Sequence, residues 1–204
     1  DAGPHVSTIV SDNRDGAYQL GKILGQALKA RGWQKGSVGI IAIPQKRANG
    51  KARTAGFMQA LQEAGIRGAD LRQQVSFSYQ ETYDFTRALI AKHPDLRALW
   101  LQGSDRYQAA LDAIAHAGRT GQILLICFDA EPEFIDMIEQ GRLVGAGMQQ
   151  PFLMGETAVK SLDTHFKGGA VARHQSLPVL AVSRDNLKTL LPTIRRNVLG
   201  LEVK

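Results

Sequence analysis

The chain has 204 residues, of which 44% are hydrophobic and 22% are charged, proportions typical of a folded globular protein and not of a disordered or collagen-like chain. Lysine and arginine exceed aspartate and glutamate by 25 to 19, but they are spread along the chain without interleaved aromatic residues, so we expect no nucleic-acid binding. No apolar run approaches the roughly 18 residues of a membrane-spanning helix, so we expect no membrane insertion.

Apolar runs of strand length alternate with amphipathic segments of helical length along the whole chain. The predicted strands are 6–10, 38–43, 75–77, 98–101, 123–128, 143–148 and 179–182. The predicted helices are 18–30, 53–64, 82–92, 105–117, 132–140, 151–167 and 186–196, the last interrupted or kinked at Pro192. This alternation is typical of βαβ units around a parallel sheet with helices on both faces. The sequence therefore predicts an α/β fold with a doubly wound parallel sheet.

The sequence lacks the motifs that carry catalysis. It contains no phosphate-binding loop, dinucleotide fingerprint, serine-nucleophile elbow or zinc-protease motif. The single cysteine, Cys127, lies in an apolar run, and the five histidines have no metal-ligand spacing. Asp129 and Glu131 could form a carboxylate pair, but no motif places a nucleophile or base beside them. We expect no enzymatic activity, no cofactor and no metal.

Polar side chains gather in the loops that follow the predicted strands. In open parallel sheets, ligands bind at the carboxyl ends of the strands, where these loops lie. Together with Phe77, Tyr79 and Trp100, such loops offer paired hydrogen bonds and aromatic surface to a small polyhydroxylated ligand. Taken singly, the aromatic residues also fit the core, and the polar residues fit helix caps and turns.

Short motifs follow one another over nearly the whole chain. They are Ser11-Asp-Asn-Arg-Asp-Gly16, Gly39-Ile-Ile-Ala-Ile-Pro44, Arg53-Thr-Ala-Gly-Phe57, His93-Pro-Asp95, Ala110-Leu-Asp-Ala113, Phe128-Asp129, Ile138 to Leu143, and Gln149-Gln-Pro151 with Met154-Gly155. In this order and at these spacings they resemble the type I periplasmic binding proteins, the ribose-binding-like group. The effector domains of lactose-repressor-type regulators share that fold.

The resemblance implies two lobes that close on a ligand by hinge bending. It assigns residues 1–12 to the end of the first lobe, 13–149 to a complete second lobe, 150–178 to a return into the first, and 179–204 to a strand that crosses back and a C-terminal helix. Most of the first lobe precedes this segment in the family. We therefore expect the chain to be the latter part of a longer protein, with strands left exposed at an edge.

The same resemblance implies roles for individual residues. Arg53 matches the arginine that donates to the ligand, Phe77 an aromatic wall, Asp129 a carboxylate that accepts from sugar hydroxyls, and Gln149 a hinge amide that binds ligand. A ligand-binding Asn-Asp pair of the family falls on Gly103-Ser104, so Ser104 or Asp105 is expected to substitute for it.

The hinge is expected at Asp12, Asn13, Gln150 and Pro151. At Asn13, capping of the following helix is favoured somewhat over ligand contact.

The predicted function is non-catalytic binding of a small, sugar-like solute in the cleft between the lobes, in the bacterial periplasm, for delivery to a membrane transporter or sensor. The alternative is the effector-binding domain of a lactose-repressor-type transcription regulator in the cytoplasm. The motifs resemble the transport group more closely. The identity of the ligand and the oligomeric state stay open.

Overall fold

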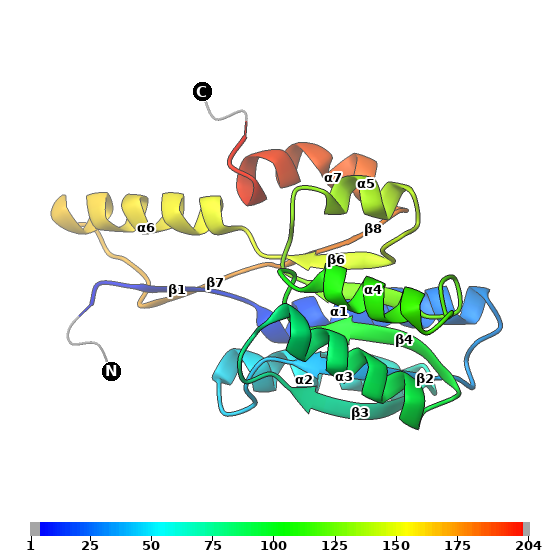
Figure 1. Cartoon of the computed structure of the whole chain (residues 1–204). Helices are drawn as coiled ribbons and strands as arrows, with labels where there is room; N and C mark the ends of the chain where they lie inside the picture. The colour runs from blue at the N-terminus through cyan, green and yellow to red at the C-terminus, as the bar shows by residue number, and fades with distance from the viewer. Residues whose placement is uncertain (1–4, 202–204) are drawn as a thin grey trace.

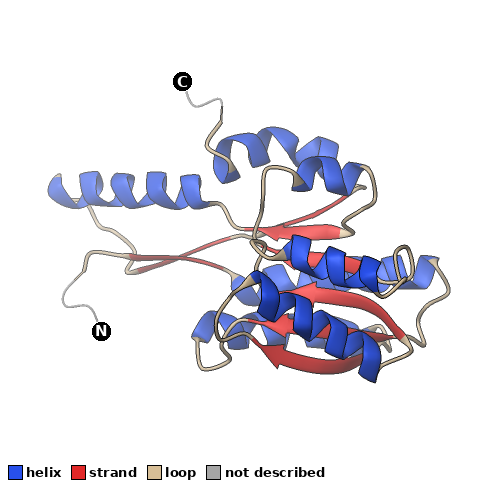
Figure 2. Ribbon diagram, viewed as in Figure 1, coloured by secondary structure: helices blue, strands red, loops and turns tan. Residues whose placement is uncertain are grey.

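A six-stranded sheet with helices on both faces forms the larger part of the structure (Figures 1 and 2). The computed structural model describes residues 5–201; the ends of the first and last predicted segments, 1–4 and 202–204, lie outside the described residues. The sheet has the order β3-β2-β4-β5-β6-β8. Its strands are β2 (Ser37–Ala42), β3 (Arg67–Gln73), β4 (Leu96–Leu101), β5 (Leu124–Phe128), β6 (Gly145–Met148) and β8 (Leu180–Ser183).

The helices divide between the two faces, which confirms the doubly wound arrangement. They are α1 (Asn13–Ala30), α2 (Ala48–Glu63), α3 (Tyr79–Lys92), α4 (Tyr107–His116), α5 (Phe134–Glu139) and α7 (Leu187–Thr193), which continues as the π-helical turn η1 (Ile194–Val198). One core packs α1 and α2 against Val38, Trp100 and Phe128. The other packs α3, α4, α5 and α7 against alternate residues of the same strands, such as Leu99 and Cys127. Because successive side chains of a strand point to opposite faces, strands apolar throughout supply both cores.

The strands from β3 to β6 run parallel, so their carboxyl ends share one edge of the sheet. The last strand, β8, pairs antiparallel with β6, which makes the sheet mixed. The loops that leave this carboxyl edge carry the predicted ligand residues.

A smaller part projects from the main body and consists of β1 (Thr8–Ser11), β7 (His174–Leu177) and α6 (Pro151–Phe166) (Figure 1). Within residues 5–201, β1 and β7 pair in parallel only with each other. Three connecting segments, 11–13, 149–151 and 177–180, join this part to the main body. The smaller part leaves apolar side chains uncovered: Val159, Leu162 and Phe166 are exposed at spacings that place them on one face of α6.

The third strand was predicted wrongly at 75–77 and lies at Arg67–Gln73. Residues 75–77 form a loop because their N–H groups bond to the Glu81 carboxylate instead of a neighbouring strand, and Phe77 has a φ of 54°. The strand β7, which is largely polar, was not predicted.

Helix ends were predicted more accurately than helix starts. Gly65, for example, follows α2 with a φ of 69°, a conformation that favours glycine. The helices α1, α2, α3 and α4 begin at residues 13, 48, 79 and 107, and not at 18, 53, 82 and 105. Pro192 lies inside α7 without ending the helical path, which widens into η1 after it.

The close contact of α1 with α2 depends on Gly56. A Cβ atom there would lie 2.0 Å from the backbone oxygen of Arg14, whereas one on Gly25 would meet Ala64 Cβ at 3.3 Å. We expect Gly56→Ala to lower the free energy of unfolding by about 2 kcal/mol or more, because backbone must move. Gly25→Ala is the control and should stay within about 0.5 kcal/mol, since helix propensity offsets mild crowding. Urea denaturation measures both, and equal values would contradict this account of the packing.

Candidate functional site

Arg53 is a buried charge at the carboxyl edge of the sheet. Only 3% of the residue is exposed, and its guanidinium lies 3.8 Å from the centre of the Phe128 ring. Its Nε donates to Asn13 Oδ1 at 2.8 Å and its NH1 to the carbonyl oxygen of Gln102 at 2.6 Å. Burial lowers the pKa of Arg53, while the neighbouring carboxylate of Asp129 acts in the opposite direction. An arginine remains charged nevertheless, so the pairing offsets the cost of burial.

Asp129 supplies the carboxylate beside this guanidinium. Its Oδ2 lies 3.6 Å from Arg53 NH1, and about a third of its side chain is exposed. Its backbone has a φ of 72°, an uncommon conformation that aspartate tolerates better than most residues. The Nε2 of Gln149 donates to Asp129 Oδ1. The structure thus brings three predicted residues, Arg53, Asp129 and Gln149, into one contact group, with part of the carboxylate open to solvent.

The capping role favoured for Asn13 is wrong, because Asp12 performs it. Asp12 Oδ1 accepts from the backbone N–H of Asp15 at 3.0 Å, which caps α1. The Asn13 side chain points elsewhere: it accepts from Arg53 and donates from Nδ2 to the Ser11 carbonyl oxygen at 3.0 Å.

A ring of one buried and two half-buried polar side chains supports the first turns of α2. Gln102 donates to Thr54 Oγ1 at 2.6 Å, Thr54 donates to Gln45 Oε1 at 2.8 Å, and Gln45 donates to Gln102 Oε1 at 3.3 Å. The ring joins the loops after β2 and β4 to the helix that carries Arg53. Sequence reasoning did not single out Gln102 or Thr54; a polar residue directly after an apolar strand is the signal that points to Gln102.

The Phe77 loop is held from both sides. The backbone N–H groups of Val75, Ser76 and Phe77 donate to the Glu81 carboxylate at 2.7 to 3.2 Å, and Arg106 Nε donates to the Phe77 carbonyl oxygen. Burial raises the pKa of Glu81, but these N–H groups act more strongly and hold it below its usual value. Sequence reasoning missed Glu81, although Ser78 and Glu81 have the spacing of a capping box.

Ser104 and Asp105 lie in contact groups apart from Arg53. Ser104 is buried and donates to Glu131 Oε1 at 2.7 Å. Asp105 is exposed and pairs with Arg106 at 2.5 Å, the same arginine that holds Phe77. The predicted residues therefore form three groups at the carboxyl edge, centred on Arg53, Arg106 and Glu131.

The predicted hinge residues lie in the connecting segments. Gln150 is buried, donates to the Pro178 carbonyl oxygen at 2.8 Å and accepts from Asn197 Nδ2 at 2.8 Å. The backbone N–H of Asp12 donates to the Leu177 carbonyl oxygen at 2.8 Å. Pro151 is the first residue of α6. The connecting segments 11–13 and 149–151 are thus each hydrogen-bonded to the third segment, 177–180.

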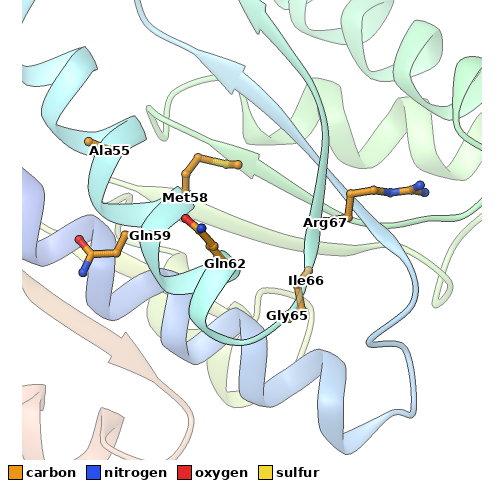
Figure 3. A pocket seen from close by; sticks show the side chains of 7 residues that line it. All are labelled: Ala55, Met58, Gln59, Gln62, Gly65, Ile66 and Arg67. Carbon is orange, nitrogen blue, oxygen red and sulfur yellow. The ribbon is translucent and has the colours of Figure 1, made fainter.

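A separate open pocket of about 560 Å³ lies beside α2, away from these residues (Figure 3). Met58, Gln59 and Gln62 line it from α2, and Arg67 from the first residue of β3. It therefore opens toward the amino end of β3, and none of the predicted ligand residues lines it.

Metal sites, a reactive thiol and membrane-spanning helices were also sought in the described part of the chain. No three histidine, cysteine, aspartate or glutamate side chains there are grouped as metal ligands. Burial raises the pKa of the Cys127 thiol, so this side chain behaves as a small apolar core residue. Among residues 5–201, no helix combines the length and apolar character of a membrane span.

Comparison with known proteins identifies the family. Residues 1–170 match the model of the periplasmic binding protein domain. The chain belongs to the periplasmic binding protein family. It is 31% identical over 168 residues to the D-ribose/D-allose-binding protein of Pseudomonas aeruginosa, covering 78% of this chain and 51% of that protein. It is 28% identical over 173 residues to the ribose import binding protein of Escherichia coli, covering 83% and 55%.

Solved structures of periplasmic binding proteins share the fold. A solute-binding protein of Actinobacillus succinogenes with bound D-allose superimposes with a TM-score of 0.82 at 20% identity, covering 92% of this chain and 66% of that chain. A fructose-binding periplasmic domain of a hybrid two-component system gives 0.76 at 16% identity, covering 98% and 66%. The chain spans about half the length of the curated relatives it matches. These relatives are named as binding proteins, in agreement with the expectation that the chain is not an enzyme.

The hydrogen bonds to Glu81 predict a pH-dependent contribution to stability. Because its pKa is lowered in the folded state, the carboxylate stabilises the fold above its usual pKa of about 4.3, and this contribution is lost as the pH falls through the lowered value. We expect Glu81→Gln to cost about 1 kcal/mol of unfolding free energy at pH 7 and less at pH 3.

Urea denaturation of both variants at the two pH values tests this expectation. The control is Glu139→Gln, because Glu139 is exposed and its side chain makes no hydrogen bond or ion pair among the described residues. A cost of Glu81→Gln that is the same at both pH values would contradict the assignment.

Proposed function

We propose that this chain supplies one side of a binding cleft for a small polyhydroxylated solute, a sugar. The observation that carries the proposal is the Arg53–Asp129 pair, a buried guanidinium beside a partly exposed carboxylate at the carboxyl edge. Ligands of doubly wound sheets bind at this edge. Such a pair offers hydrogen-bond donors and acceptors within a few ångströms of each other, as neighbouring hydroxyls require.

Arg53 and Asp129 keep donor and acceptor positions that no protein group within residues 5–201 uses, and this supports a ligand on the pair. Arg53 Nε and NH1 donate to protein oxygens, whereas NH2 has no acceptor within residues 5–201. Asp129 accepts from Gln149 through Oδ1 and keeps further acceptor positions. The aromatic ring of Phe77 follows β3 at the same edge and has the Arg47 guanidinium 5.8 Å from its centre. The names of the relatives, which specify ribose and allose, agree with a sugar.

We infer that the smaller part belongs to the first lobe, so that 5–12 and 150–178 lie in that lobe and 13–149 and 179–201 in the second. Two parallel strands alone make a marginal sheet. The exposure of Val159 (67%) and Phe166 (81%) on α6 indicates a surface that another element covers. Closure of the cleft is proposed to bend the three connecting segments.

The names of similar proteins support a proposal for the biological setting. Delivery of the bound sugar to a membrane transporter, from the periplasm, is supported by the name of the E. coli relative, which describes import. Delivery to a membrane sensor is the second possibility. It is supported by the name of the fructose-binding periplasmic domain of a hybrid two-component system.

Two conservative substitutions in the full-length gene product test the site. Asp129→Asn keeps the size of the side chain but replaces a charged acceptor, and Arg53→Lys loses the planar fork of donors. We expect each to weaken sugar binding about 100-fold or more, with the fold retained, as judged by circular dichroism. Asp136→Asn on α5 is the control and should bind as the unmodified protein does.

The measurement is a thermal-shift screen with D-ribose, D-allose and D-apiose, followed by calorimetric titration of the sugar that binds. Unchanged affinity in both site variants would overturn the site. The absence of binding by the unmodified protein to any sugar of a broader panel would overturn the proposed function.

A further inference from the structure

The orientation of Arg53 depends on a residue of a connecting segment. A guanidinium has five N–H donors in a fixed plane. Here Nε points to Asn13 and NH1 points to Gln102 and Asp129, whereas NH2 has no acceptor within residues 5–201. The ring of Phe128 lies 3.8 Å from the guanidinium carbon and supports the plane, but an aromatic face does not determine which edge points outward. The hydrogen bonds to Nε and NH1 determine that edge.

Asn13 is itself held in place. It lies between β1 and the first turn of α1, and its Nδ2 donates to the carbonyl oxygen of Ser11, the last residue of β1. Its two polar groups are therefore engaged by Arg53 and by the strand. Because Asp12 caps α1, the side chain of Asn13 is not needed for the helix to begin.

The carboxylate partner is held in a similar way from another connecting segment. Gln149 directly follows β6 and donates to Asp129. Amides from two of the three segments that join the smaller part to the main body thus bind the two charged groups of the site. A movement of either segment changes the hydrogen bonds available to a charged group.

We propose that Asn13 is a positioning residue for solute binding: its Oδ1 fixes the Nε edge of Arg53, so that NH2 faces the solute, and it couples the first connecting segment to the occupied site. This inference rests on the proposed function. Loss of the Oδ1 acceptor leaves a buried, charged N–H without a partner, and the guanidinium reorients to find one. The solute then meets a misplaced donor.

Two substitutions at Asn13 separate positioning from structure. Asn13→Leu keeps the number and branching of the side-chain heavy atoms and has no acceptor. Asn13→Asp keeps an oxygen for Arg53, loses the donor to Ser11 and adds a negative charge beside the guanidinium. In the full-length gene product we expect Asn13→Leu to raise the dissociation constant at least tenfold and Asn13→Asp to stay within about threefold of the unmodified protein. The control is Ser37→Ala at the amino end of β2, which removes a hydrogen bond to Asp95 and should lower the melting temperature without changing the dissociation constant.

An NMR signal that needs no sugar provides the independent readout. The Arg53 Nε–H resonance should be resolved and slow to exchange with water in the unmodified protein and in Asn13→Asp, and broadened or fast to exchange in Asn13→Leu. If Asn13→Leu does not fold, Asn13→Ala takes its place with the same expectation.

The outcomes distinguish the two proposals. If no sugar binds the unmodified protein while the Nε–H resonance changes as expected, the proposed function fails and the positioning contact stands. If a sugar binds and Asn13→Leu binds it equally well, the positioning role is overturned. Equal weakening by Asn13→Leu and Asn13→Asp, with the resonance unchanged, also overturns it, because it indicates direct contact of the Asn13 amide with the sugar.

Discussion

A buried guanidinium needs a neutralising carboxylate and hydrogen-bond acceptors, and this requirement organises the carboxyl edge of the sheet. An unpaired charge in the interior costs several kcal/mol. Arg53 avoids this cost through one carboxylate, one backbone carbonyl, one asparagine and one aromatic face, contributed by three different segments of the chain. Each partner is therefore constrained in position by the same side chain.

The two hydrophobic cores make this arrangement possible. Strands that are apolar on both faces place their ends at one edge, and the loops that follow carry the polar groups. The helix that carries Arg53 is set in place by its contact with α1 at Gly56 and by the ring of Gln45, Thr54 and Gln102. These contacts thus fix the position of the Arg53 guanidinium relative to the Phe128 ring and the Asp129 carboxylate.

The sequence pattern predicted correctly the strands and helix ends that depend on apolar residues and glycines. It failed for the elements and side-chain roles that depend on polar contacts. Strands buried on both faces were found because their residues are apolar throughout, and helix ends were found from glycines such as Gly65. The strand Arg67–Gln73 lies at the edge of the sheet and is largely polar, so its pattern resembled a loop, while the apolar Val75 and Phe77 resembled a strand. The starts of α1, α2 and α3 were placed too late because the first turns of these helices are largely polar.

Within the site, the family motifs led to Arg53, Asp129 and Gln149, which the structure brings together. Asn13 was assigned to capping because asparagine before a helix has that preference. The neighbouring Asp12 has the same preference, and the buried charge of Arg53, 40 residues away in sequence, decides between them. Such a choice depends on a long-range contact that local pattern does not contain.

The central claim is that the Arg53–Asp129 pair binds the hydroxyls of a sugar at the carboxyl edge of this sheet. The most direct measurement is a crystal structure of the full-length gene product with the sugar that most raises its melting temperature. We expect sugar hydroxyls within hydrogen-bonding distance of Arg53 NH2 and of the Asp129 carboxylate, with the connecting segments on either side of the closed cleft. A sugar bound elsewhere, with the Arg53–Asp129 pair facing only water, would contradict it.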